Sequence, residues 1–125
     1  SIRWRVADTN DYDASRKQVF DGPVAMLIDE QSFSAAEDTA ASFKLMKRGP
    51  IIGMPSGGST GQPYMFSLPG GGTARICVKR DTYLDGSNFV GVGVIPDIKA
   101  ALTLADVRQG RDSVMETAAK KLLKE

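Results

Sequence analysis

The sequence predicts an α/β fold, and three neighbouring segments carry this prediction. Residues 24–28 (Val-Ala-Met-Leu-Ile) form a short apolar run between Gly22-Pro23 and Asp29-Glu30, a pattern typical of a strand buried on both faces. A helical pattern follows over residues 34–48, and a second apolar segment, Ile51-Ile52-Gly53, comes directly after it. Strand, helix and strand in this order predict two parallel strands joined by a crossover helix.

The predicted helix has a recognisable start, buried face and end. Ser34-Ala35-Ala36-Glu37 spells a capping box, in which the hydroxyl and the carboxylate each satisfy a free backbone N–H at the start of a helix. Gly49-Pro50 ends the helix, because proline cannot continue it. Apolar residues at three- and four-residue spacing predict the buried face: Ala36, Ala40, Phe43 and Met46, widened by Ala41 and Leu45.

The middle of the chain predicts a β-hairpin. After a flexible Gly-rich loop at residues 55–61, residues 64–68 are predicted to form a strand that ends in the turn 69–72 (Pro-Gly-Gly-Gly). Residues 73–79 alternate between apolar and polar side chains, which predicts a second strand with one buried face. The side chains expected on that face are Ala74, Ile76 and Val78. Cys77 has no second cysteine to pair with, and we expect a small buried or half-buried side chain there.

The C-terminal part of the chain is predicted to be helical. Thr103 caps a short helical turn over residues 104–107, and Asp112 caps a last helix. That last helix has one apolar face, made of Val114, Met115, Ala118, Ala119, Leu122 and Leu123. Residues 1–21 are polar and charged and predict a lead-in segment, so that the packed domain covers residues 22–125.

Composition limits the chemistry that the chain can perform. Among 125 residues there is no histidine, so the chain holds no complete Ser-His-Asp site and no His-based zinc site. Lys and Arg number 16 against 15 Asp and Glu, and no basic run occurs, so we expect no nucleic-acid partner. The apolar stretches are far shorter than the ~20 residues that cross a bilayer, and we expect no membrane span, signal peptide, metal or cofactor. The start Ser1-Ile2-Arg3 lacks Met, which suggests a segment of a longer chain.

Ser34 is the candidate nucleophile, because it stands between a buried strand and the first turn of a helix. The free N–H groups and the dipole of a helix start stabilise a nearby oxyanion, and the N–H of Ala35 is the natural donor. A structural interpretation is also open, since serine is a favoured N-cap. The loop of Gly57, Gly58 and Ser59 is either a mobile turn or the lining of a substrate cleft beside Ser34. Asp97 is either a cleft carboxylate or a turn cap.

Several segments in order resemble the tail-specific, or C-terminal processing, serine peptidase family. They are Pro23 to Glu37, Gly53, Gly57-Gly58, the Leu68-Pro-Gly-Gly-Gly turn, Gly91 to Ile98 (Gly-Val-Gly-Val-Ile-Pro-Asp-Ile), Thr103 to Asp106, Gly110, Asp112 and Ala118. The resemblance covers about residues 22–124. It implies an α/β fold related to ClpP and crotonase, with Ser34 as the nucleophile and the Ala35 N–H as an oxyanion donor. It also implies that residues 22–125 are the C-terminal part of a catalytic domain.

The chain departs from one branch of that family at the general base. In the lysine-using branch the base lies 25 residues after the nucleophile, and that position is Ser59 here, whose hydroxyl cannot take the proton of Ser34 at neutral pH. The Gly-Gly loop instead resembles the branch of the tricorn core and the retinoid-binding-protein repeats, in which an upstream histidine is the base. Such a histidine would precede residue 1. The supporting Glu of that branch is not evident either, since Phe89 and Val90 occupy its neighbourhood.

The resemblance therefore predicts a serine endopeptidase that acts on peptides or proteins when an upstream part of the parent chain supplies the base. The isolated chain is predicted to be inactive. An extracytoplasmic site in bacteria, periplasmic or in the cell envelope, is implied as well. Two alternatives are a non-catalytic homologue that binds peptide or an apolar ligand in the same cleft, and a crotonase-like acyl-CoA enzyme, for which no acyl-CoA motif is visible.

Overall fold

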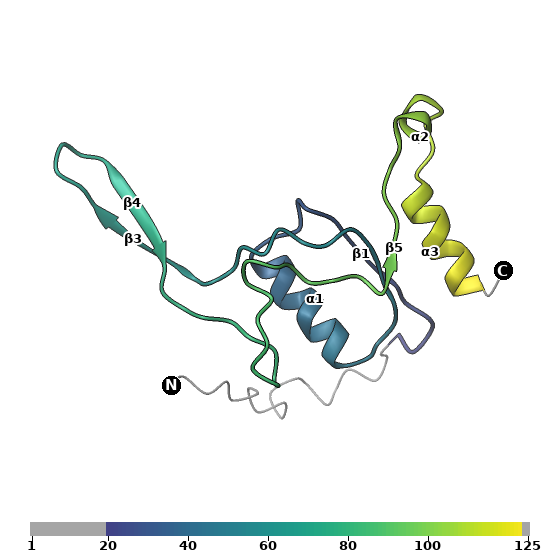
Figure 1. The fold of residues 1–125 in the computed structure, drawn as a ribbon, viewed down its shortest axis with the longest axis horizontal. Helices are drawn as coiled ribbons and strands as arrows, with labels where there is room; N and C mark the ends of the chain where they lie inside the picture. The colour runs from purple at the N-terminus through teal and green to yellow at the C-terminus, as the bar shows by residue number, and fades with distance from the viewer. Residues whose placement is uncertain (1–19, 124–125) are drawn as a thin grey trace.

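The computed structural model describes residues 20–123 and shows a mixed α/β architecture (Figure 1). Its elements in chain order are β1 (Met26–Ile28), α1 (Ala35–Leu45), β2 (Ile51–Gly53), β3 (Pro63–Ser67), β4 (Thr73–Cys77), β5 (Ile98–Lys99), α2 (Leu104–Arg108) and α3 (Ser113–Leu123). The predicted α/β class, crossover unit, hairpin and C-terminal helices are all present. The predicted lead-in segment lies outside the described residues, except for its last two.

A small parallel sheet forms the centre of the molecule. Its strand order is β1-β2-β5, with β2 in the middle, and Met26 pairs with Ile51 while Ile52 pairs with Ile98. Helix α1 connects β1 to β2 and packs against β1, as a crossover helix does. Helix α3 contacts β1 and β2, and Figure 1 shows the sheet between α1 and α3. The β2 residues are buried, as predicted for the second strand. The prediction that the strand of residues 24–28 is buried on both faces is wrong, because Leu27 in β1 is 36% exposed.

The core centres on β2, where Ile51 and Ile52 have no exposed surface. Helix α1 contributes a buried face that differs from the predicted one. Its buried residues are Glu37, Ala40, Ala41 and Phe43, whereas Ala36, Leu45 and Met46 are exposed. The apolar pattern misplaced the two ends of this face, because it could not include Glu37, a charged side chain that is buried through hydrogen bonds to another segment.

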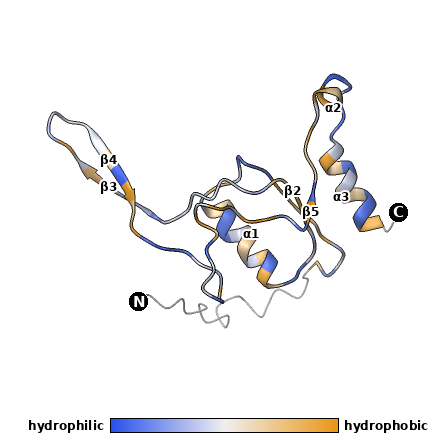
Figure 2. Ribbon diagram, in the orientation of Figure 1, coloured by the Kyte–Doolittle hydropathy of each residue, from blue (hydrophilic) through white to orange (hydrophobic). Residues whose placement is uncertain are grey.

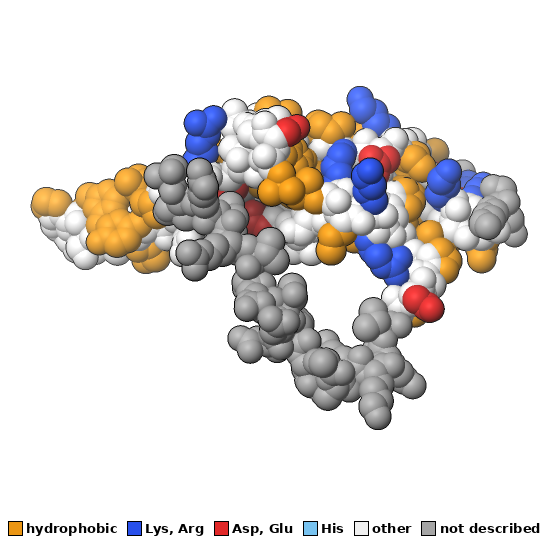
Figure 3. Space-filling model, turned by 90° about the horizontal axis from the view of Figure 1, so that it is seen from below, with side chains coloured by type: hydrophobic (Ala, Val, Ile, Leu, Met, Phe, Trp, Pro, Cys, Tyr) orange, Lys and Arg blue, Asp and Glu red, His pale blue; other side chains and the backbone are white. Residues whose placement is uncertain are grey.

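The hairpin of β3 and β4 projects away from the sheet (Figure 1). Its strands are antiparallel, with Tyr64 opposite Ile76 and Phe66 opposite Ala74. Figure 2 colours part of each strand as hydrophobic, and Figure 3 shows hydrophobic side chains on the face of the hairpin that is turned to the viewer. The predicted buried face is wrong for the described residues, since Ile76 is 57% and Val78 is 59% exposed. Cys77 is exposed too, against expectation. Alternation correctly predicts the strand, but every residue of β3 and β4 is exposed except Ala74, which is half-buried.

The structure contains both helix caps that the sequence predicts near the C-terminus. Thr103 Oγ1 accepts a hydrogen bond from the Asp106 N–H at 3.1 Å, and Asp112 Oδ1 accepts one from the Met115 N–H at 2.8 Å. Only one row of the apolar face of α3 packs inward: Ala118 is buried, with Val114 and Leu122 half-buried on either side, while Met115, Ala119 and Leu123 are exposed. Among the helices of residues 20–123, none is long and apolar enough to cross a membrane.

Candidate active site

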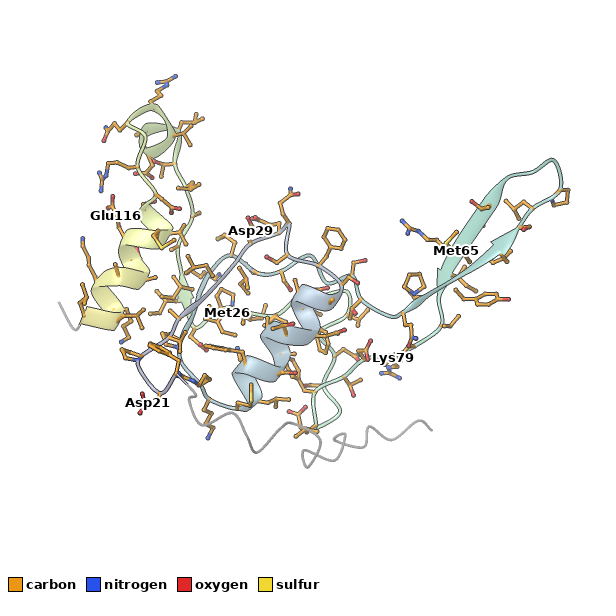
Figure 4. All side chains as sticks on the ribbon, turned by 180° about the vertical axis from the view of Figure 1, so that it is seen from behind. Asp21, Met26, Asp29, Met65, Lys79 and Glu116 are labelled. Atoms are coloured by element: carbon orange, nitrogen blue, oxygen red, sulfur yellow. The ribbon has the colours of Figure 1, made fainter. Side chains whose placement is uncertain are left out.

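Ser34 lies where the chain turns from β1 into α1. The turn after β1 is held by Asp29, whose carbonyl oxygen accepts from the Ser32 N–H at 2.9 Å and whose Oδ1 accepts from the Gln31 N–H at 2.9 Å. Figure 4 shows Asp29 at this turn, at the end of the strand that carries Met26. The parallel strand β1 thus places Ser34 at the start of α1. Such strand ends are where ligands bind in open α/β sheets.

The backbone of Ser34 is strained. Its φ of 57° and ψ of −126° lie in a region that side-chain-bearing residues rarely adopt, at a cost of about 1–3 kcal/mol. Two hydrogen bonds from its N–H maintain this geometry, one to the Ser59 carbonyl oxygen at 2.9 Å and one to Glu37 Oε2 at 3.2 Å. A sharp, strained strand-to-helix turn is also how α/β-hydrolases expose a nucleophilic serine.

Two polar groups at this turn are left unpaired. The Glu37 N–H donates to the Ser34 carbonyl oxygen at 2.8 Å, and the Ser34 side chain makes no cap hydrogen bond although it occupies the capping-box position. The N–H of Ala35 donates to no described residue, and Ala35 is exposed. A hydroxyl and a neighbouring N–H at a positive helix end are therefore both available to a ligand.

Glu37 connects the helix start to the Gly-rich loop. The side chain has no exposed surface, and its Oε1 accepts hydrogen bonds from Ser56 Oγ at 2.5 Å and the Gly58 N–H at 2.6 Å. Its Oε2 accepts from the Ser59 N–H at 2.8 Å and the Ser34 N–H at 3.2 Å. Burial of a carboxylate is unfavourable unless such donors surround it, so these contacts make the loop and the helix one unit.

Of the three loop residues predicted beside Ser34, Ser59 contacts it directly, while Gly57 and Gly58 contact the nearby residues Ser32 and Glu37. The Gly57 N–H donates to the Ser32 carbonyl oxygen at 2.9 Å, and the Gly58 carbonyl oxygen accepts from the Gly91 N–H at 2.7 Å. Gly58 has a φ of 68°, and a Cβ there would lie 2.9 Å from the Gly93 nitrogen, so glycine is required. The loop is therefore fixed on several sides, which argues against a mobile turn.

Asp97 takes the structural role that the sequence left open. Its Oδ2 accepts a hydrogen bond from the Ile51 N–H at 2.8 Å, and its Oδ1 lies 3.7 Å from Lys44 Nζ. It thus caps the start of β2 and does not line the region of Ser34.

Sequence reasoning missed the role of Glu37 in the loop, although a Glu on the apolar side of α1 was a signal that could have found it. Within residues 20–123, no three side chains of the types that bind metals come together as a site.

A crossover sheet with a serine at a strained helix start is typical of α/β hydrolytic enzymes. The chain belongs to peptidase family S41, whose family model matches residues 1–100. This confirms the tail-specific peptidase family inferred from the sequence.

Individual relatives agree with this assignment. A candidate tricorn protease homologue of Streptomyces coelicolor is 31% identical over 103 residues, which are 79% of this chain and 9% of that protein. The crystal structure of a candidate peptidase from Parabacteroides merdae has a TM-score of 0.73 at 30% identity and covers 81% of this chain and 32% of the other. The photosystem II D1 C-terminal processing protease has a TM-score of 0.54 at 28% identity and covers 63% of this chain and 20% of the other. The chain thus spans only a minor part of each relative's length.

Proposed function

We propose that this chain is part of a serine peptidase domain in which Ser34 Oγ attacks the carbonyl carbon of a peptide bond. The observation that carries the proposal is the strained turn that presents the Ser34 hydroxyl next to the unpaired N–H of Ala35. Membership of peptidase family S41 supports it. In this proposal residues 22–125 are the C-terminal part of the catalytic domain, and residues 1–21 lead into it.

The proposed reaction follows from these two groups. The bond from Ser34 Oγ to the carbonyl carbon forms, the hydroxyl proton leaves to a base, and the carbonyl oxygen becomes an oxyanion. The Ala35 N–H and the helix dipole stabilise that charge. Collapse of the intermediate breaks the C–N bond, and the base returns the proton to the leaving amine. Water then hydrolyses the acyl-enzyme and restores the hydroxyl. The loop of Gly57, Gly58 and Ser59 borders this site, where we expect the substrate backbone.

The base must come from outside this sequence. The chain has no histidine, and Ser59 stands where the lysine-using branch has its base. Both oxygens of Glu37 are occupied by four donors, so this carboxylate positions backbone groups and does not take the proton of Ser34. Phe89, near the expected position of a supporting Glu, is 3% exposed in the core. We infer that an upstream part of the parent chain supplies a histidine.

Covalent labelling tests the proposed nucleophile. A parent chain that includes the upstream residues is treated with a fluorophosphonate, which reacts with activated serines, and the labelled peptide is identified by mass spectrometry. The expected result is one label on Ser34, absent from Ser34→Ala and retained in Ser59→Ala. Labelling of another serine, or none, contradicts the assignment.

The non-catalytic alternative is not favoured, because the named relatives are described as proteases or peptidases. It would be favoured by a parent chain without an upstream histidine.

The substrate that we propose is a peptide or protein. We also propose an extracytoplasmic location, supported by the family resemblance, and fractionation of cells that express the parent chain tests it. Recovery of the parent chain only with cytoplasmic markers contradicts that location.

A further inference from the structure

A second cavity lies along α1, between the helix and residues 81–89. It has a volume of about 230 Å³. The helix contributes Asp38 and Ser42 to its wall, and the segment contributes Asp81 and Tyr83. Its apolar wall includes Leu45, which is 46% exposed, and Leu84, which is 87% exposed. The cavity therefore combines carboxylates with an apolar entrance.

Asp81 is the unusual group in this cavity. The residue is only 4% exposed, and its Oδ1 forms an ion pair with Lys79 Nζ at 2.8 Å. Figure 4 shows Lys79 beside α1, where β4 returns to the body of the molecule. The other oxygen, Oδ2, accepts no hydrogen bond from any residue of the described part of the chain. A buried carboxylate oxygen without a donor is destabilising, so this atom is prepared for a ligand that brings one.

The surroundings favour a positively charged ligand. Asp38, the second carboxylate, uses its Oδ1 to accept from Thr60 Oγ1 at 3.2 Å. Burial raises the pKa of Tyr83, and the negative charges of Glu37 and Asp85 raise it further. A ligand with an apolar stem and a cationic head suits apolar walls that end in two carboxylates. Arginine matches best, because its planar guanidinium carries five donors and pairs with carboxylates in a bidentate manner.

The cavity begins close to Ser34. Asp38 follows Ser34 by one helical turn, about 6 Å along the axis of α1, and its N–H donates to the Ser34 carbonyl oxygen at 3.2 Å. Thr60, which binds Asp38, directly follows Ser59, whose carbonyl oxygen accepts the Ser34 N–H. An extended peptide advances about 3.3 Å per residue, so a side chain one or two positions from the scissile bond reaches this distance.

We propose that the cavity between α1 and residues 81–89 binds the guanidinium of an arginine in the peptide substrate, with Asp81 and Asp38 as its carboxylate partners. This inference rests on the proposed peptidase function and names its substrate class. It makes Asp81 and Asp38 specificity residues, which contact the substrate away from the reacting atoms.

Binding without turnover tests this proposal. The whole chain carrying Ser34→Ala is titrated calorimetrically with an acetylated alanine tetrapeptide amide that contains one arginine. The matched peptide carries citrulline, which has nearly the same shape but no charge. We expect at least tenfold tighter binding of the arginine peptide, since a charge-assisted hydrogen bond is lost with citrulline. Asp81→Asn and Asp38→Asn should each reduce this ratio severalfold, while Glu30→Gln, the same charge change at an exposed residue, should preserve it.

Three results with the peptides overturn the proposal. These are equal affinity for the two peptides, no binding of either peptide, and an arginine preference that survives in folded Asp81→Asn and Asp38→Asn proteins. Circular dichroism establishes folding, and Asp38→Asn carries the test if Asp81→Asn unfolds. Calcium chloride that binds in place of the arginine peptide also overturns it. This experiment measures no cleavage, so a negative result does not affect the assignment of Ser34 as the nucleophile. In the same way, a negative result in the Ser34 labelling does not change the binding result.

Discussion

Glu37 is a charged side chain with no exposed surface, and four hydrogen-bond donors surround it. Three of these donors are backbone N–H groups of Ser34, Gly58 and Ser59. Because Gly58 and Ser59 give their N–H groups to Glu37, they are not free to bind an oxyanion in this arrangement. The residue therefore holds the loop in place and leaves the Ala35 N–H as the donor at the helix start.

Replacement of Glu37 by Gln tests this role. The amide keeps the shape but turns one acceptor oxygen into a donor that faces N–H groups, so at least one buried donor loses its partner. We expect the free energy of unfolding in urea to fall by about 2–4 kcal/mol. The matched control is Glu116→Gln, which removes an exposed carboxylate paired with Arg111 and should hardly move the denaturation midpoint. Equal stability of Glu37→Gln and the unmodified chain contradicts the role.

The strain at Ser34 gives a second prediction for a single residue. Glycine adopts positive φ without penalty, so Ser34→Gly should be about 1 kcal/mol more stable than Ser34→Ala. Ser42, in the middle of α1, provides the control, and there glycine should be less stable than alanine by about 1 kcal/mol. Urea denaturation of the four variants measures both differences. The same order of glycine and alanine at the two sites contradicts a strained Ser34.

At the scale of elements, local patterns located the helices and strands better than they located the contacts between them. The capping-box sequence marks the start of α1 correctly, and the apolar run 51–53 matches β2. The predicted helix end is wrong, since α1 stops at Leu45, where Lys47 takes a positive φ before Gly49-Pro50 is reached. The exposed hairpin could not be foreseen, since the alternation of residues 73–79 indicates a strand but not what covers it. The position of Ser34 could be predicted from the sequence, whereas three of the four hydrogen bonds to Glu37 come from a loop some twenty residues away.

Two isoleucines test the contrast between the sheet and the hairpin. Ile51 in β2 has no exposed surface, while Ile76 in β4 is 57% exposed. Ile51→Ala should lower the free energy of unfolding of this chain by about 2–5 kcal/mol, because it leaves a cavity in the core. Ile76→Ala should change it by less than about 1 kcal/mol, since the side chain is already largely hydrated. Similar losses at both sites would show that the hairpin is buried, contrary to the structure.

At the scale of the whole molecule, we propose that this chain supplies part of a catalytic apparatus. The Ser34 hydroxyl and the Ala35 N–H lie together at the start of α1. Because the sequence has no histidine, the proposed base is a residue in an upstream part of a longer parent chain. We therefore expect no cleavage by the isolated chain and cleavage by the parent.

Peptide cleavage tests the central claim most directly. A fluorogenic peptide that contains arginine is incubated with the isolated chain, with the parent chain, and with parent variants Ser34→Ala and Ser59→Ala. We expect turnover only by the parent and by Ser59→Ala, and at least a thousandfold loss of kcat in Ser34→Ala, since removal of a nucleophile costs that much or more. Cleavage by the isolated chain that Ser34→Ala abolishes would contradict an external base, and full activity of Ser34→Ala in the parent would contradict Ser34 as the nucleophile.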